Sequence, residues 1–262
     1  MIYLIRGYMK KIIKWILKSL GYQINKYNQN RVLINRLDWT PFKEENDNHK
    51  LYKAGIKKSG EEWTDEFSKQ LRFHSLIQII KRILHEDKIF DFVECGCWRG
   101  HSSYIISRLI QDANKDIKFH IFDSFEGGLS VSTPEDKDFY LKDEKHKTWM
   151  TKHFASSESF VKDTVLKEFA FVKTYNGWIP ERFKEVEDKS FSLIHVDVDL
   201  YQPTFDTVDF FFPRLVKGGA IICDDYNSSQ FPGAKDAWDK YFKNQKFDFF
   251  YESPFGGCFL IK

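Results

Sequence analysis

Residues 89–110 read IFDFVECGCWRGHSSYIISRLI, and this stretch decides the fold. Residues 89–93 are typical of a buried strand, and residues 94–100 form a turn that contains two glycines. Residues 101–110 repeat apolar side chains at helical spacing. A strand, a glycine turn and a helix in that order place backbone N–H groups at the start of a helix, where a polar ligand can dock. The stretch therefore predicts a ligand-binding unit of an α/β fold.

The glycine turn departs from the pattern of dinucleotide-binding proteins. Its spacing is Gly96-x-x-x-Gly100, and the carboxylate of Glu94 at the strand end would repel a pyrophosphate but attract an ammonium group. A second predicted strand, 118–122, ends in Asp123. A nucleoside-binding fold places at this point the acid that accepts hydrogen bonds from ribose hydroxyls. The two strand ends together favour a nucleoside-containing cofactor.

Two later strands also end in carboxylates. Residues 191–196 and 220–223 are runs of strand-forming residues, and the acidic residues that follow them are Asp197, Asp199, Asp224 and Asp225. Because ligands bind outside the carboxyl ends of parallel strands, we expect these carboxylates to converge on one point. Oxygen-only clusters of this kind suit Mg²⁺ or a similar hard cation. His195 lies inside the apolar strand, which favours a core histidine over a base.

Strands and helices alternate along the rest of the chain. The remaining strands are predicted at 169–173, 247–252 and 258–261, with helices at 205–215 and 234–242 and a turn at Gly218 and Gly219. The polar, lysine-rich stretch of about 128–167 is interpreted as a lid insertion. This layout is typical of a Rossmann-like class I methyltransferase, an α/β fold with a mostly parallel seven-stranded sheet and a C-terminal antiparallel hairpin.

Four motifs in order resemble the macrocin O-methyltransferase family: ECGCWRG at 94–100, FDSFEG at 122–127, HVDVDLY at 195–201 and GGAIICDDY at 218–226. The resemblance covers residues 63–262. It implies an enzyme that depends on S-adenosylmethionine and Mg²⁺ and methylates a hydroxyl of a sugar or glycan-type natural product. The implied partner is therefore a small-molecule or glycan acceptor.

The resemblance also implies roles for individual residues. It makes Asp197, Asp224 and Asp225 the metal ligands, with Asp197 also the general base and Asp199 a neighbouring or ligating carboxylate. A metal at this point would stabilise the alkoxide that develops on a weakly acidic sugar hydroxyl. The implied cofactor-binding residues are Glu94 for the methionine ammonium, Gly96 and Gly100 for close approach, Asp123 for the ribose, and Ser124 and Trp178 for the adenine.

Two other functions fit part of the pattern. In a nucleotide-sugar-dependent glycosyltransferase, Asp197 and Asp199 would be the metal motif, but Glu94 and Asp123 would have no role. In a non-catalytic membrane-associated scaffold, buried carboxylates would serve no purpose, although each costs several kcal/mol when it is unpaired. Nucleic-acid binding is not expected, because the basic residues concentrate in one terminal segment without a recognition motif.

The first sixty residues are expected to lie outside the methyltransferase domain, 61–262. Residues 1–36 hold eight of the 40 basic residues and none of the 38 acidic ones. Residues 5–20 predict a basic amphipathic helix that is neither a transmembrane span nor a secretory signal. This helix either lies on an anionic membrane or packs against the domain or a second subunit of a homodimer. Residues 25–36 and 43–50 are interpreted as linker.

The cysteines bear on the compartment. The four of them lack zinc-site spacing, and three fall within or beside predicted buried strands, where a free cysteine behaves as a small hydrophobic residue. This pattern predicts a reducing, cytoplasmic location. If residues 5–20 bind lipid, the enzyme would be peripheral at the inner membrane leaflet.

Overall fold

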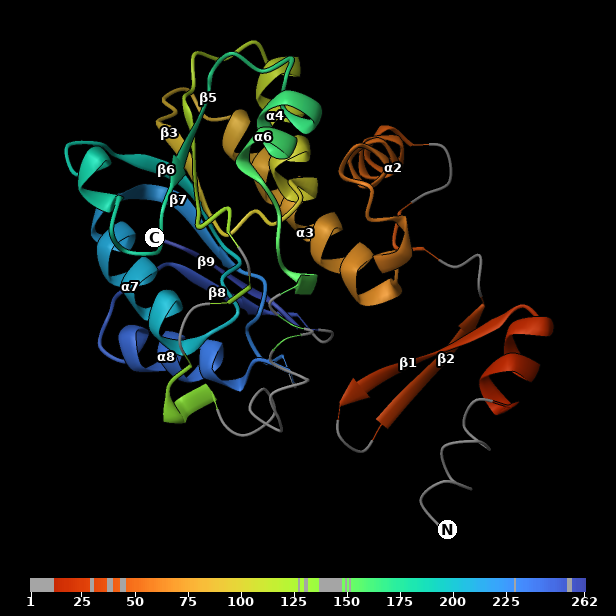
Figure 1. Cartoon of the computed structure of the whole chain (residues 1–262). Helices are drawn as coiled ribbons and strands as arrows, with labels where there is room; N and C mark the ends of the chain where they lie inside the picture. The colour runs from red at the N-terminus through yellow and green to blue at the C-terminus, as the bar shows by residue number, and fades with distance from the viewer. Residues whose placement is uncertain are drawn as a thin grey trace.

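The computed structural model of the chain is built on a seven-stranded sheet covered by helices (Figure 1). The strands lie in the order β5-β4-β3-β6-β7-β9-β8. Their bounds are β3 Asp91–Cys95, β4 Phe119–Asp123, β5 Val172–Asn176, β6 Phe191–Val196, β7 Leu215–Cys223, β8 Phe249–Glu252 and β9 Cys258–Ile261. The structure describes residues 12–28, 31–36, 40–42, 46–126, 128–129, 132–136, 148, 150, 152–228, 230–253 and 256–262.

The sheet is parallel except at one edge. Strands β3 to β7 pair in parallel, whereas β9 runs antiparallel to β7 and β8 antiparallel to β9. This topology confirms the predicted class I methyltransferase fold with its C-terminal hairpin. The carboxyl ends of β3, β6 and β7 consequently lie side by side, so the residues that follow these strands meet at one edge.

Successive residues of each central strand point to opposite faces of the sheet, and both faces are buried. On one face, Phe92, Leu193 and Ile222 pack with the helices α2 Asp47–Ser59, α3 Phe67–Leu84 and α4 His101–Asp112. On the other face, strand residues such as Ile194 and Ile221 pack with α7 Tyr201–Phe211 and α8 Pro232–Phe242. This two-sided burial explains why a strand such as β6 has a mostly apolar sequence and does not alternate apolar and polar residues.

Short helical elements complete the chain. They are the 3₁₀-helices η1 Glu62–Thr64, η2 Pro134–Asp136, η4 Phe183–Val186 and η5 Phe212–Arg214, the short α6 Glu158–Phe160 and the π-helix η3 Val161–Val165. Part of the predicted lid, including residues 137–147, lies outside the described residues. Within the described part of the chain, no helix is long and apolar enough to cross a membrane.

Three of the elements predicted above have boundaries that differ by three or more residues from the sequence prediction. Strand β5 begins three residues late, because the buried Phe169 belongs to a turn in which its N–H donates to the carbonyl of Leu166. Helix α7 begins at Tyr201 and not at 205, directly after the acidic motif. Gly218 and Gly219 lie inside β7, where its register with β6 shifts, and do not form a separate turn.

The first sixty residues hold more regular structure than predicted. Strands β1 Tyr22–Asn28 and β2 Arg31–Arg36 pair antiparallel where the sequence predicts linker, and Figure 1 shows this hairpin apart from the main sheet. Residues 12–19 are helical, whereas residues 5–11 of the predicted helix lie outside the described residues. Helix α2 covers part of the segment 43–50, and its Tyr52 and Ile56 belong to the buried core. The packed core therefore begins before Glu61.

We expect a chain that starts at residue 61 to melt at a lower temperature than one that starts at residue 46. The shorter chain lacks Tyr52 and Ile56, and burial of each such side chain contributes about 1.5–3 kcal/mol. Thermal unfolding followed by circular dichroism compares the two. Equal melting temperatures would show that α2 does not stabilise the domain.

Candidate active site

A cavity at the carboxyl edge of the sheet, open to solvent, has a volume of about 570 Å³. It opens between the ends of β3, β4 and β6. Its lining includes four of the six predicted cofactor-binding residues together with the predicted base, namely Gly96, Asp123, Ser124, Trp178 and Asp197. The structure therefore brings most of the predicted site residues into one cavity.

Gly96 has a structural role that the sequence did not reveal. Its φ is +81°, and a Cβ atom at this position would lie 1.8 Å from the carbonyl oxygen of Asp197. Beside this contact, the N–H of Asp197 donates a hydrogen bond of 2.9 Å to the carbonyl of Cys95, the residue before Gly96. Glycine is thus required by the approach of the Asp197 backbone, besides leaving room in the cavity.

Gly100 does not line the cavity. It is the N-cap of α4 with a φ of +86°, and a Cβ atom here would approach Val165 at 3.3 Å and Val161 at 3.4 Å. Those valines belong to the π-helix η3. Gly100 consequently lets the start of α4 pack against η3. The sequence analysis expected the cofactor to approach Gly100 closely, whereas in this structure the valines of η3 do so.

Asp123 organises the glycine turn. Its Oδ2 accepts hydrogen bonds from the N–H groups of Cys97 at 2.8 Å and Trp98 at 3.1 Å, and its Oδ1 accepts one from Phe125 at 2.9 Å. The carboxylate also borders the cavity. A carboxylate oxygen has further lone pairs, so Asp123 can hold the turn and still accept hydrogen bonds from a ligand.

Glu94 does not reach the cavity. Its side chain is fully buried, its Oε2 accepts a hydrogen bond from the hydroxyl of Ser103, and its Oε1 lies 2.9 Å from Nδ1 of His195. Protein groups therefore partner both carboxylate oxygens of Glu94, and the expected contact with a methionine ammonium stays a prediction. The β3–β6 register places Glu94 directly opposite His195, so both point to the same face.

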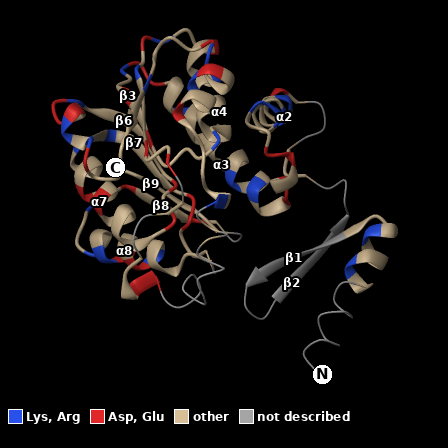
Figure 2. Ribbon diagram, viewed as in Figure 1, with Lys and Arg blue, Asp and Glu red and all other residues tan. Residues whose placement is uncertain are grey.

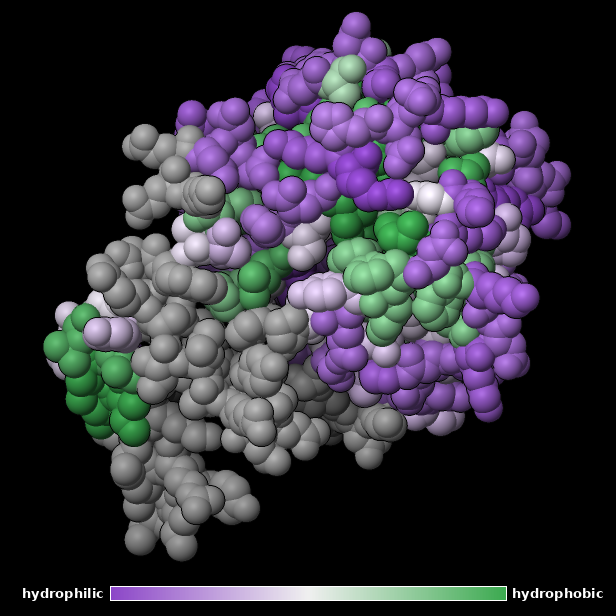
Figure 3. Space-filling view, turned by 180° about the vertical axis from the view of Figure 1, so that it is seen from behind, coloured by the Kyte–Doolittle hydropathy of each residue, from purple (hydrophilic) through white to green (hydrophobic). Residues whose placement is uncertain are grey.

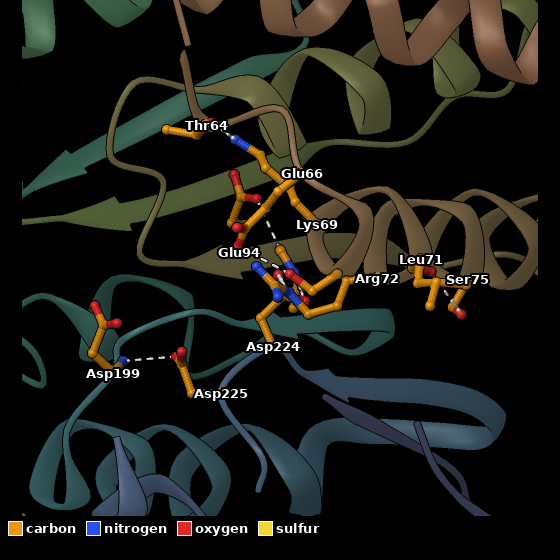
Figure 4. Close-up of polar contacts among 12 residues, drawn as sticks. Thr64, Glu66, Lys69, Leu71, Arg72, Ser75, Glu94, Asp199, Asp224 and Asp225 are labelled. Carbon is orange, nitrogen blue, oxygen red and sulfur yellow. Dashed lines mark hydrogen bonds and ion pairs between the residues drawn. The ribbon is translucent and has the colours of Figure 1, made fainter. Parts of the chain in front are cut away.

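His195 joins Glu94 to the acidic motif that follows β7. Its Nε2 lies 3.2 Å from Oδ1 of Asp224, and Nε of Arg72 on α3 donates to Oδ2 of the same carboxylate at 3.3 Å (Figure 4). Burial alone would lower the pKa of His195, but the contacts with Asp224 and Glu94 outweigh burial and raise that pKa well above its usual range. His195 is thus a partnered core histidine, as predicted.

The acidic cluster contains two of the three predicted metal ligands. Ligand atoms of His195, Asp197 and Asp224 all lie within 4.8 Å of one another. Asp225 is turned toward the neighbouring loop, where its Oδ2 accepts a hydrogen bond of 2.9 Å from the N–H of Asp199. The sequence analysis did not place His195 in this group. The available signal was that His195 lies two residues before Asp197, so that both side chains point to the same face.

The carboxylates of the cluster and the neighbouring Asp199 and Asp225 repel one another. Burial, and then repulsion by Asp224 and Asp225, raise the pKa of Asp197 well above its usual range. Burial, and then repulsion by Asp225, do the same for Asp199. Burial and Asp224 raise the pKa of Asp225 to about 6. Arg72 and His195 therefore do not offset all of the negative charge, and the oxygen-rich donor set fits a hard divalent cation.

Aromatic side chains that the sequence analysis did not single out also border this cavity. Trp98 and Phe154 both line it, and their rings lie 5.8 Å apart. Nε1 of Trp98 donates to the carbonyl of His153 at 3.0 Å, and the two rings are stacked. His153 and Phe154 come from the predicted lid. The lid segment is thus held over the glycine turn by Trp98.

The comparison with known families decides between the functions left open by the sequence. The family model of macrocin O-methyltransferase (TylF) matches residues 9–249. The chain belongs to the macrocin O-methyltransferase family. It is therefore an O-methyltransferase, and neither the glycosyltransferase nor the scaffold is favoured.

Curated relatives support the assignment. The methyltransferase is 26% identical over 232 residues to demethyldecarbamoylnovobiocin O-methyltransferase of Streptomyces niveus, covering 83% of this chain and 84% of the relative. It is 28% identical over 159 residues to 8-demethyl-8-(2,3-dimethoxy-alpha-L-rhamnosyl)-tetracenomycin-C 4'-O-methyltransferase of Streptomyces olivaceus, covering 59% of this chain and 60% of the relative.

A solved structure shows the same fold. The O-methyltransferase NovP superposes with a TM-score of 0.64 at 20% identity, over 82% of this chain and 99% of that chain. At this identity the likeness concerns the fold alone. It agrees with the class I methyltransferase architecture described above.

The pKa values of the acidic cluster predict how pH acts on the metal-free protein. The pKa of Asp225 is raised to about 6, against about 3.9 in an unfolded chain, so its stabilising contribution is complete below pH 4 and is lost as pH rises to about 6. Asp224 acts in the opposite sense: its pKa is lowered to about 2, so its contribution is lost only as pH falls toward 2.

Added Mg²⁺ is therefore expected to raise the melting temperature more at pH 7.5 than at pH 5.0, because a cation binds the ionised carboxylates. Thermal melts at the two pH values, with and without Mg²⁺, measure the difference. In the Asp225→Asn variant, the stability contribution that the wild type loses between pH 4 and 6 is expected to be absent, so its melting temperature should fall less over this range. An equal effect of Mg²⁺ at both pH values would contradict the assignment of these carboxylates.

Proposed function

We propose that the chain transfers a methyl group from S-adenosylmethionine to a hydroxyl of a sugar or glycosylated natural product, with the help of a divalent cation. The observation that carries the proposal is the position of Asp197, which lines the cavity at the carboxyl edge and also belongs to the acidic cluster. The names of the relatives describe methylation of novobiocin, rhamnosyl-tetracenomycin and mycinamicin precursors, which supports an acceptor of this class.

The cofactor is assigned to the cavity at the carboxyl edge. Asp123 would accept hydrogen bonds from the ribose, and Ser124 and Trp178 would border the adenine, since all three line this cavity. Gly96 would leave room beside the turn. Glu94 and Gly100 lie outside the cavity, so we assign them to the support of the acidic cluster and of the turn.

The metal is assigned to Asp197 and Asp224, whose ligand atoms lie within 4.8 Å of each other, and to Asp225, which would have to offer the oxygen that does not accept from the N–H of Asp199. When bound, the cation would stabilise negative charge on the acceptor oxygen and orient it. Asp197 is the proposed base: it takes the hydroxyl proton as the methyl group passes from sulfur to oxygen. In the absence of a cation, burial and the neighbouring carboxylates raise the pKa of Asp197. A bound cation would offset that repulsion and favour the ionised carboxylate that a base requires.

Calorimetric titration with S-adenosylmethionine tests the cofactor assignment. Asp123→Ala is expected to weaken binding by about 1.5–3 kcal/mol, or more than tenfold, because charge-assisted hydrogen bonds to the ribose are lost. Glu94→Gln, outside the cavity, is expected to change the affinity much less. An Asp123→Ala protein that melts like the wild type and binds with unchanged affinity would refute the assignment.

Methyl transfer, but not cofactor binding, should stop in EDTA.

We also propose that the enzyme is cytoplasmic and that its N-terminal helix contacts the inner membrane leaflet. All four cysteines are free and buried, as in a reducing compartment. Trp15 in the helix and Leu20 directly after it are 71% and 65% exposed, and Figure 3 shows apolar side chains of this segment at the surface. Lys14 and Lys18 lie on the same helix (Figure 2). An anionic lipid surface would complement both features.

Liposome sedimentation tests this role. Each basic residue near an anionic surface contributes about 1 kcal/mol, so the full chain is expected to bind phosphatidylglycerol vesicles and to release them as salt rises. A chain that starts at residue 22 should lose binding at unchanged melting temperature and mass. A drop in melting temperature or in mass, without vesicle binding by the full chain, would instead identify a packing or dimer helix.

A further inference from the structure

The turn between β6 and α7 carries two of the carboxylates discussed above. Asp197, Val198 and Asp199 follow β6 directly and line the cavity at the carboxyl edge of the sheet. Residues 197–200 belong neither to β6 nor to α7, so no regular hydrogen-bond pattern fixes them along their length. The positions of the two carboxylates therefore depend on the contacts that hold this short turn.

Two of these contacts lie at the start and in the middle of the turn. The N–H of Asp197 donates to the carbonyl of Cys95 at 2.9 Å. The N–H of Asp199 donates to Oδ2 of Asp225 at 2.9 Å (Figure 4). Asp199 has a φ of +61°, which is uncommon for a residue with a side chain and persists where the surrounding contacts fix the backbone. The turn consequently needs a firm hold at both of its ends.

The contact at the far end comes from the predicted lid. Leu200 occupies the N-cap position of α7, and its aliphatic side chain cannot accept a hydrogen bond. Asp136 of η2, which lies 65 positions before Tyr201 in the chain, supplies the missing acceptor: its Oδ1 accepts from the N–H of Tyr201 at 2.7 Å. A carboxylate is also favoured at this place by the positive end of the helix dipole. Asp136 thus caps a helix to which it does not belong.

Asp136 is itself firmly placed. Its side chain is buried, and its Oδ2 accepts from the N–H of Thr133 at 2.7 Å and from the Thr133 hydroxyl at 3.2 Å. Gly233, near the start of α8, leaves room for the carboxylate, because a Cβ atom there would lie 2.1 Å from Oδ1 of Asp136. One oxygen of Asp136 therefore contacts its own segment, and the other contacts α7 directly after the acidic turn.

We propose that Asp136 is a positioning residue for the proposed metal site. By anchoring the end of the turn after β6, it keeps Asp197 and Asp199 in the arrangement that binds the cation. The inference rests on the proposed function for the identity of the ligand, and it adds the segment that controls the affinity. Without this anchor the turn samples other arrangements, and the apparent affinity falls with the fraction of molecules in the binding arrangement.

Titration of the full chain with Mn²⁺, followed by the electron paramagnetic resonance signal of the free ion, tests the proposal. Mn²⁺ prefers the same oxygen ligands as Mg²⁺. Asp136→Ala is expected to bind Mn²⁺ about threefold to tenfold more weakly, which corresponds to a binding arrangement populated about 10–30% of the time. Asp136→Asn keeps an oxygen that can accept from Tyr201, so it should retain most of the wild-type affinity.

Asn46→Ala is the matched control. The side chain of Asn46 caps α2 by accepting from the N–H of His49 at 2.8 Å, so this variant also loses a helix cap. Both alanine variants are expected to melt at a lower temperature, but Asn46→Ala should bind Mn²⁺ like the wild type. Equal weakening in the two alanine variants, unchanged affinity in Asp136→Ala, or an Asp136→Asn variant as weak as Asp136→Ala would overturn the positioning role.

Amide hydrogen exchange without added metal separates this inference from the proposed function. Asp136→Ala is expected to speed exchange in peptides that cover residues 197–204, whereas Asn46→Ala should not. If the wild type binds no Mn²⁺ and exchange still rises in Asp136→Ala, the metal assignment fails, and with it the effect on affinity, while the anchoring of the turn stands. If the wild type binds Mn²⁺ and Asp136→Ala changes neither exchange nor affinity, the anchor fails and the metal assignment stands.

Discussion

The chain of contacts from Glu94 through His195 to Asp224 is the interaction on which the active site depends. It crosses three neighbouring strands, because Glu94 lies opposite His195 in the register of β3 and β6, and Asp224 follows β7. All three side chains are buried. Removing His195 would leave two buried carboxylates without this partner, and breaking a buried ion pair of this kind costs about 3–5 kcal/mol.

The contacts from Glu94 to Asp224 also explain how the acidic cluster can exist without a bound cation. Asp224 keeps a pKa of about 2 because His195 and Arg72 offset the cost of burying its carboxylate. Asp197 and Asp199 have no direct cationic partner of that kind among the described residues, and their pKa values rise. The protein thus fixes one ionised carboxylate with its own side chains and leaves its neighbours in need of positive charge.

The sequence was sufficient for the fold and for the edge of the sheet that carries the site. Periodicity and glycine turns are local signals, so they located β3, β4, β6 and α4 to within about two residues. Whether Glu94 faces a ligand or His195 depends on strand register, which is a long-range property. The packing of α2 and the pairing of β1 with β2 were missed for a related reason, since their polar composition resembles linker.

The contact between Gly96 and Asp197 shows how one residue serves both halves of the site. The glycine belongs to the turn that borders the cavity proposed for the cofactor, yet the atom that excludes a side chain there is the carbonyl oxygen of Asp197. A larger residue would have to push the Asp197 backbone away from β3. Since Asp197 is the proposed base and a member of the acidic cluster, such a shift would misplace the proton acceptor relative to the methyl donor. A displacement of about 1 Å is enough to slow a positioned reaction about a hundredfold. In this fold Gly96 is therefore needed for the turn after β3 and also for the position of the proposed base, Asp197, after the neighbouring strand β6.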